Sequence, residues 1–274
     1  MRRALLIVGA VLVLFMTYRI LGVYEFRAGE CKALKPRKFA VTYPKRLRVM
    51  TFNIEGHASL FNSNHIAEIA ATIRKYNPDI VGINEAHRNT WQSRFSDHAE
   101  ELGRLTGMNV VFGRSYTFMH GDFGNAVLTR GVIVSSAVHD LPGTGEPRSL
   151  LETIVRINGG TIDFYVTHTT AWASINRETR DLQLQCLNAH VNASAYPYVL
   201  VGDLNAPPES PEVAHFLNGN VLRLAGDPKT PTHKVMNERL DYILTDAGWQ
   251  VLGSRVIDEG PSDHRPVLAE LAHP

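Results

Sequence analysis

YVLVGDLN, residues Tyr198–Asn205, joins a short apolar run to a glycine, an acid and an amide. The run itself, Tyr198–Val201, is rich in valine and is typical of a buried strand. Two prolines follow at once in Ala206-Pro207-Pro208, so the strand cannot continue. Because side chains alternate along a strand with a period of two, we expect Asp203 and Asn205 to point the same way.

Two interpretations of this strand end are open. Oxygen-bearing groups at a rigid strand end suit a hard cation, or a water molecule that must be oriented for reaction. Alternatively, Asp203 closes the strand with an Asx turn, which is the commoner meaning of such a pattern taken alone. Other parts of the chain are needed to decide whether this strand end is only a turn or part of a functional site.

Composition bounds the class of protein. The chain has 274 residues, of which 44% are hydrophobic and 20% charged, as in an ordinary globular protein of one large or two small domains. Its two cysteines, Cys31 and Cys186, are too few for a disulfide scaffold and lack metal-ligand spacing, and the sequence gives no support for a bridge between them. Neither a GxGxxG nor a P-loop motif occurs.

Charge is distributed unevenly. Residues 1–48 hold 11 Lys/Arg and 2 Asp/Glu, whereas the other 17 Lys/Arg and 25 Asp/Glu leave the rest of the chain with a net charge of −8. Nucleic-acid-binding proteins normally carry a basic footprint. The acidic main part therefore disfavours nucleic acid as a partner.

The N-terminal segment predicts attachment to a membrane. Arg2 and Arg3 precede Ala4–Tyr24, whose 21 residues match the ~20 that a spanning helix needs. We predict an uncleaved signal anchor over residues 1–24, with a cleaved signal peptide as the alternative. Basic residues lie on both sides of it, so the positive-inside rule does not fix the orientation.

Residues 25–46 are basic, contain two prolines and show no sustained period, so they are predicted to form a tether. Its cations are suited to anionic lipid headgroups. We expect a membrane-anchored protein with an extracytoplasmic catalytic domain, or a secreted or periplasmic one if the segment is cleaved. The oligomeric state is left open.

A single domain is predicted over residues 47–274, with strands and helices in alternation. The predicted strands are 47–54, 79–83, 110–112, 124–129, 150–157, 161–167, 198–201, 240–244, 251–257 and 267–271, and the predicted helices are 64–76, 97–105 and 175–191. Hairpin-like strand pairs are interspersed, which favours a mixed α/β layered fold over a purely parallel sheet.

Residues that bind hard cations or transfer protons recur at the strand ends. They are Asn53, Glu85, His168, Asp203 with Asn205, Asp241, and Asp263 with His264. Each has an ordinary structural explanation by itself, but strand ends on one edge of a layered sheet converge on one crevice. The oxygen ligands suit Mg²⁺ or Mn²⁺ rather than structural zinc, and the histidines suit proton transfer near neutral pH.

The chain resembles the endonuclease/exonuclease/phosphatase superfamily, which has the deoxyribonuclease-like fold. The resemblance covers about residues 47–271 and rests on RVMTFNIEG, DIVGINEA, GNAVLTR, FYVTHT, VLVGDLNAPP, RLDYILT and SDHRPV, in family order. It implies a four-layer αββα sandwich of two mixed β-sheets flanked by helices, preceded here by an N-terminal hydrophobic helix. It also implies divalent-metal-dependent hydrolysis of a phosphate ester, with Mg²⁺ or Mn²⁺ as cofactor.

For the metal, the resemblance implies that Glu85 is the main carboxylate ligand, with Asn53 and Asp263 near the ion or ions. One departure is Asn84, where the family often has glutamine; the change is chemically conservative and leaves metal binding in place. For the substrate, Asn125 resembles a residue that lines the site, and Arg148 stands where some relatives place a basic contact.

For catalysis, Asp203 resembles the residue that orients or deprotonates the attacking water, and Asn205 the residue that holds the phosphate. His264 resembles the histidine that contacts the phosphate, with Asp241 fixing its tautomer. His168 resembles the second active-site histidine, which assists the leaving group. Family members differ in which group is the base, so that assignment stays open.

The substrate is expected to be a membrane lipid phosphodiester, on account of the anchor and the acidic domain. Alternatives are nucleic acid, a soluble phosphomonoester and, from a different class, a catalytically inactive membrane-tethered binding module. The complete set of acids and histidines in the motifs argues against the last.

Overall fold

In the computed structural model, the described residues are 31, 42–118, 120–143, 145–171, 173–219 and 222–273. The predicted N-terminal hydrophobic helix, residues 1–24, lies outside them, as does most of the predicted tether, 25–46. Within the described residues, no helix is long and apolar enough to cross a membrane.

Twelve strands, four α-helices and one 3₁₀ helix are described. The strands are β1 Arg46–Asn53, β2 Ile80–Arg88, β3 Asn109–Phe118, β4 Gly121–Thr129, β5 Val132–Leu141, β6 Arg148–Ile157, β7 Gly160–His168, β8 Tyr198–Asp203, β9 Arg223–Leu224, β10 Asp241–Thr245, β11 Gln250–Val256 and β12 Val267–Ala272. The helices are η1 Gly56–Leu60, α2 His65–Tyr76, α3 His98–Thr106, α4 Ala173–Ala193 and α5 Pro211–Asn218.

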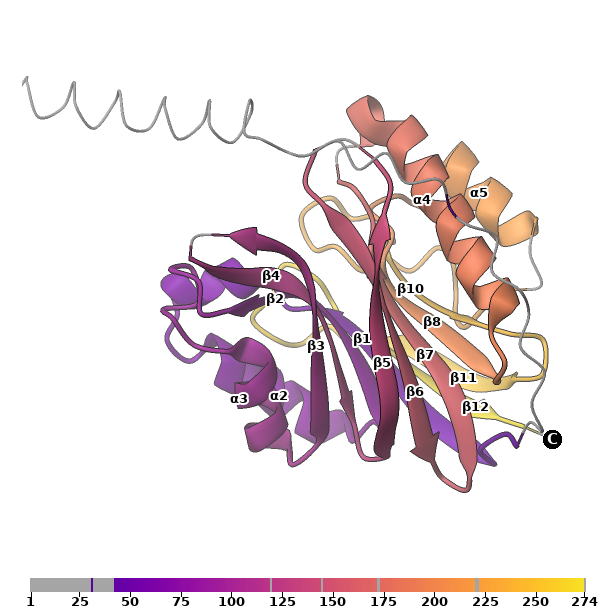
Figure 1. Ribbon diagram of the computed structural model, residues 1–274, viewed down its shortest axis with the longest axis horizontal. Coiled ribbons are helices and arrows are strands. Elements are labelled where there is room, and N and C mark those ends of the chain that lie inside the picture. The colour runs from indigo at the N-terminus through magenta and orange to yellow at the C-terminus, as the bar shows by residue number, and fades with distance from the viewer. Residues whose placement is uncertain are drawn as a thin grey trace, which may run out of the picture.

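The strands form two six-stranded sheets that pack face to face. Their orders are β11-β12-β1-β2-β4-β3 and β5-β6-β7-β8-β10-β9. The pairs β1–β2 and β7–β8 are parallel and the other described pairs are antiparallel, so both sheets are mixed. Helices α2 and α3 cover the outer face of the first sheet, and α4 and α5 cover that of the second (Figure 1). The predicted four-layer αββα sandwich is confirmed.

Strand β1 shows how sequence alternation builds the layers. Leu47 and Val49 are buried between the two sheets, whereas Met50 and Phe52 are buried against α2 and α3. A strand that is covered on both faces needs apolar residues on both, which explains its nearly continuous apolar run. A third apolar layer joins the second sheet to α4 and α5.

Several elements differ from the sequence predictions. Strands β2, β3 and β4 are longer than predicted, and β5, β9, η1 and α5 were not predicted. Most of β5 is exposed, because it lies at the edge of its sheet, so it lacks the apolar alternation that marks a half-buried strand. Helix α5 has only eight residues, too few for a clear helical period.

The folded domain begins before Leu47. Tyr43 stacks on His273, with ring centroids 3.8 Å apart, and its hydroxyl donates to Asp246 at 3.0 Å. Cys31 forms a disulfide with Cys186 on α4, with Cα atoms 5.1 Å apart. No sequence pattern supports this bridge, because 155 residues separate the two cysteines and only the fold brings them together.

Candidate active site

Asn84 on β2 hydrogen-bonds residues of both sheets near the ends of the parallel strands. Its Nδ2 donates to the Thr167 carbonyl on β7 and to Asn125 Oδ1 on β4, both at 2.8 Å. Its Oδ1 accepts from the Asp203 amide on β8 at 3.1 Å. Asn84 therefore supports the site from behind. Asn125, which is 1% exposed, also donates to the Ser149 carbonyl on β6, so it too joins the two sheets next to Asn84.

Asp203 divides its two carboxylate oxygens between local structure and the site. Oδ1 accepts from the Asn205 amide at 2.7 Å, so the Asx turn is present. Oδ2 accepts from Asn53 Nδ2 at 3.1 Å and lies 3.7 Å from Nε2 of both His168 and His264. The two interpretations of this strand end are thus compatible, because one oxygen makes the turn and the other enters the cluster.

The glycine of GDLN is needed at this point of the fold. Gly202 has φ 137°, and a Cβ atom there would overlap the Thr167 carbonyl oxygen on β7. Beyond the strand, Asn205 takes a left-handed conformation with φ 51°, and its Nδ2 donates to the Thr169 carbonyl at 2.9 Å. Asn205 therefore does not simply continue the alternation of β8 as predicted.

Asn53 connects the acids of the two sheets. Its Nδ2 donates to Glu85 Oε1 and to Asp203 Oδ2, both at 3.1 Å. Glu85 lies within β2 rather than after it, at a bulge where its φ of 61° turns the side chain out of the regular pleat. Asp263 is near enough to Glu85 to raise the pKa of its carboxyl, an effect that adds to the larger one of burial.

Asp241 and His264 form a tight buried pair. The His264 Nδ1 and the Asp241 Oδ2 are 2.8 Å apart, and both residues are at most 5% exposed. Burial acts to lower the pKa of His264, but Asp241 and Asp203 outweigh it and raise the value to about 10. His264 is therefore an imidazolium at neutral pH, with its Nε2 directed to Asp203.

The pKa values of the other two central groups, His168 and Asp203, are shifted in opposite directions. Burial, followed by the nearby Arg148 and His264, lowers the pKa of His168 well below its usual value, so this ring is neutral. Burial raises the pKa of Asp203 to about 7, with Asp241 adding to the shift and His264 opposing it. An acid that titrates near neutral pH is suited to general base catalysis.

Arg148 is the main cation of the site. It is 5% exposed at the start of β6, and its Nη2 pairs with Glu146 at 3.1 Å. Its Nε and Nη1 are buried without a hydrogen-bond partner in the described structure. Buried donors without partners are uncommon, and a guanidinium is the usual partner of a phosphate. Arg148, the predicted substrate contact, therefore has two buried donors without a partner among the described residues.

A cavity of about 290 Å³ lies beside Glu146. It is lined by His57, His87, Gln92, Tyr116, Phe118, Phe123 and Glu146. The cavity therefore adjoins Arg148 through its partner Glu146.

Sequence reasoning missed three supporting residues. Ser262 Oγ donates to the Asn53 carbonyl at 2.7 Å and accepts from the His264 amide at 3.0 Å. Glu55 accepts from the Asp263 amide at 2.9 Å. Arg180 on α4 is fully buried, pairs with Glu212 at 2.7 Å and donates to the Asn205 carbonyl. Glu55 lies in the motif NIEG and Ser262 in the motif SDHRP. No local sequence pattern marks Arg180.

The donor set fits a divalent cation. Ligand atoms of Asp203, Asp241 and His264 lie within 4.8 Å of one another, and so do those of His233, Asp263 and His264. Asp241 Oδ1 is buried without a hydrogen-bond partner in the part of the chain that the structure describes. Carboxylate-rich sites of this kind suit a hard cation that retains water.

The sequence profile of the Endonuclease/Exonuclease/phosphatase family matches residues 50–264. The chain belongs to this family. Its members hydrolyse phosphoesters, so the prediction that the protein is an enzyme of this class is confirmed. A comparison with curated proteins found no match.

Several solved structures are similar to the chain in fold. A family member from Beutenbergia cavernae is 25% identical with a TM-score of 0.73, and the match covers 84% of this chain and 72% of that one. The human nocturnin catalytic domain, with bound sulfate, is 21% identical with a TM-score of 0.67 and coverage of 85% and 96%. A mannosyl-6-phosphatase from Bacteroides thetaiotaomicron is 18% identical with a TM-score of 0.67 and coverage of 82% and 99%. The last two show the shared fold.

Proposed function

We propose that this family member is a divalent-metal-dependent phosphodiesterase that acts at a membrane surface on a lipid headgroup phosphodiester. The observation that carries the proposal is Arg148, a buried guanidinium with two unpartnered nitrogens beside a carboxylate-rich centre. A phosphoryl group that reached it would also lie near His168, whose pKa Arg148 affects, and whose Nδ1 is buried without a partner in the described structure.

Asn53, Glu85 and Asp263 would hold the cation, Mg²⁺ or Mn²⁺. When bound, the ion supplies charge neutralisation at a phosphoryl oxygen. The protein's contribution is to hold the two carboxylates and the amide in place, through the Asn53–Glu85 bond and the Glu55–Asp263 bond.

Asp203 orients the attacking water and accepts its proton, for which a pKa of about 7 is suitable. The imidazolium of His264, held by Asp241, donates to a phosphoryl oxygen and stabilises the charge that develops there. Asn205 contacts the phosphate from the turn after β8. Neutral His168 hydrogen-bonds the leaving oxygen.

The aromatic cavity supports an organic substituent on the phosphate. Tyr116, Phe118 and Phe123 offer ring faces and Glu146 a carboxylate, a combination that suits a headgroup with a positive charge. This favours a substituted phosphodiester over a small phosphate, and the cavity would hold the group released.

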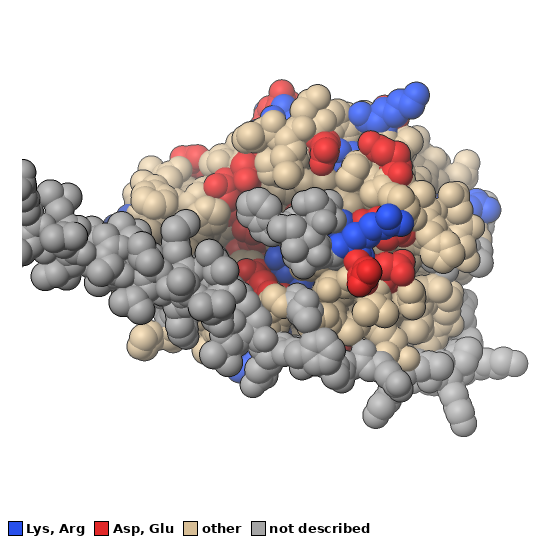
Figure 2. Space-filling view, turned by 90° about the horizontal axis from the view of Figure 1, so that it is seen from above, with Lys and Arg blue, Asp and Glu red and all other residues tan. Residues whose placement is uncertain are grey.

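Three features support action at a membrane outside the cytoplasm. The apolar segment Ala4–Tyr24 has the length of a membrane span. The Cys31–Cys186 disulfide is of a kind that persists in oxidising compartments. On the face seen in Figure 2, acidic side chains gather near the middle with basic ones beside them, rather than one basic field of the kind nucleic acid requires.

One assay distinguishes the proposed activity from the alternative activities. Full-length protein in detergent is given Mg²⁺, Mn²⁺ or a chelator, with phospholipid vesicles, a generic phosphodiester, a phosphomonoester or plasmid DNA as substrate. We expect metal-dependent hydrolysis of the vesicle lipid and the generic diester. Preference for the phosphomonoester or for DNA would replace the proposed substrate class with that of a phosphatase or a nuclease. No metal-dependent hydrolysis of any substrate would overturn the proposal and favour a membrane-tethered binding module.

A further inference from the structure

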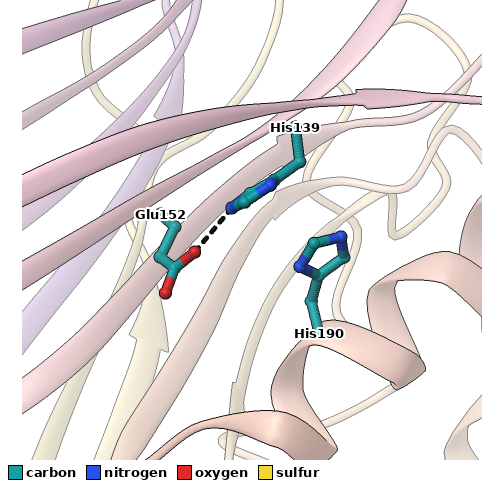
Figure 3. Close-up of side chains that lie close together, drawn as sticks. All are labelled: His139, Glu152 and His190. Carbon is teal, nitrogen blue, oxygen red and sulfur yellow. Dashed lines mark hydrogen bonds and ion pairs between the residues drawn. The ribbon is translucent and has the colours of Figure 1, made fainter. Parts of the chain in front are cut away.

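A second group of metal-binding side chains lies away from the catalytic centre. His139 on β5, Glu152 on β6 and His190 in the last turn of α4 each offer a ligand atom, and these atoms lie within 4.8 Å of one another. Figure 3 shows the three side chains facing a common space, with one nitrogen of His190 directed to the other two residues. We call these three residues the outer cluster.

The register of the second sheet sets this geometry. His139 pairs with Leu150, so Glu152, two residues further along β6, lies diagonally across on the same face. Leu150 packs in the apolar layer beneath α4, so this is the outer face of the sheet. His139 Nε2 and Glu152 Oε2 are 2.5 Å apart, and the His139 and His190 ring centroids are 4.2 Å apart.

We propose that His139, Glu152 and His190 bind a zinc-type divalent transition metal at a second site. Two imidazoles and one carboxylate are a recognised zinc ligand set that leaves a fourth position for water. Imidazole ligands disfavour Mg²⁺ and Ca²⁺, which take oxygen, so this site differs in chemistry from the catalytic one.

Buried and half-buried side chains lie beside these ligands. The half-buried ring of His190 packs against that of His139, so two imidazole groups border the same space. Close to Glu152, Asp163 is 2% exposed and accepts from the Tyr165 hydroxyl at 2.6 Å and from Ser194 Oγ at 2.9 Å.

The outer cluster is separate from the catalytic centre. Along β6, Glu152 is four residues from Arg148, or about 13 Å at ~3.3 Å per residue. Its three residues are partly exposed, so a metal ion can enter from solvent. A bound ion would join the β5–β6 edge of the sheet to the end of α4, and its expected role is structural rather than catalytic.

The test measures metal binding rather than hydrolysis. Full-length protein carrying Glu85→Ala, Asp263→Ala and His264→Ala, which removes the two proposed carboxylate ligands of the catalytic metal and the histidine shared by both central ligand groups, is stripped with chelator. It is then titrated with Co²⁺ by absorption and with Zn²⁺ by calorimetry. We expect one Co²⁺ per chain with a tetrahedral spectrum. Adding His139→Ala or His190→Ala should weaken binding by about 100-fold or more. His215→Ala, an exposed histidine on α5, is the matched control and should change nothing.

Two results would overturn the proposal: no stoichiometric binding in the starting variant, or equal affinity after His139 or His190 is replaced. A second measurement uses proteins with an intact catalytic centre, in case the multiple variant does not fold. There, Zn²⁺ should raise the melting temperature of the parental protein more than that of Glu152→Gln. Equal shifts in these two proteins would also contradict a metal site at the outer cluster.

Discussion

The catalytic centre and the outer cluster are built from the same kinds of side chain, yet they differ in burial and in how the chain delivers them. Asp203, Asp241 and His264 are buried at strand ends and come from segments with family motifs. His139 and Glu152 project from the faces of neighbouring strands and meet a helix, each partly exposed. The difference teaches that burial at converging strand ends brings acids and histidines close enough to shift one another's pKa values, whereas the outer cluster leaves similar groups open to solvent.

The largest expected effect tests whether chemistry is confined to the catalytic centre. Asp203→Ala or His264→Ala should lower kcat for a phosphodiester by about 10³-fold or more while the fold survives, because the proton acceptor or the charged donor is lost. Steady-state kinetics with circular dichroism checks this. The matched variant His139→Ala should keep parental kcat, and near-parental turnover in Asp203→Ala would show that the assigned roles are wrong.

A smaller loss is expected for the substrate contact. Arg148→Ala should lower kcat/KM by about 10²-fold, since charge-assisted hydrogen bonds to the phosphate are removed at one buried position. Arg156, an exposed residue on the same strand, provides the control, and Arg156→Ala should behave as the parent. Equal effects of the two substitutions would indicate a general electrostatic contribution instead of a specific contact.

Removing the disulfide tests how much the link between Cys31 and α4, next to the outer cluster, contributes to stability. Cys186 lies one helical turn before His190, so the bridge to Cys31 fixes the N-terminal segment to the same end of α4. Replacing Cys31 by serine should cost about 2–4 kcal/mol of unfolding free energy, measured by denaturant titration. An unfolding free energy equal to that of the parent, in this variant or in the reduced protein, would contradict the expectation. At low temperature, where the variant is folded, kcat should not change.

The last effect concerns stability at acid pH and a buried histidine that belongs to neither the catalytic centre nor the outer cluster. Burial, with a contribution from His65, lowers the pKa of His98 from 6.5 to about 3. The unfolded chain therefore binds the proton first, so the stability that this group contributes is present above pH 6.5 and is lost as the pH falls toward 3.

His98→Asn retains an acceptor for the His87 amide and removes the titration. The fall of unfolding free energy with pH should become shallower by at most about 1.4 kcal/mol per pH unit, as followed by denaturant titrations across the acid range. An unchanged slope would mean that burial of His98 does not contribute to acid sensitivity.

Prediction from sequence succeeded where a local pattern has a local cause. The strands β1, β7 and β8 were predicted because they carry the apolar runs that strands covered on both faces need, and their alternation with helices favoured a mixed layered fold. The four-layer αββα sandwich itself was implied by the resemblance to the family. Strand β5 was missed because an exposed edge strand lacks that pattern. The predicted position of Glu85 after a strand was wrong in detail, since a bulge with positive φ keeps the residue inside β2.

By itself, the sequence determined the order of the elements and the set of acids, amides and histidines at the strand ends, because side-chain alternation and motif spacing are local properties. Only the tertiary structure decided which of these groups touch. Asp203 meets Asn53 across 150 residues of chain, and His139, Glu152 and His190 meet through sheet register and the placement of α4. Such contacts depend on how layers pack, and packing is settled by the whole apolar core rather than by any one stretch.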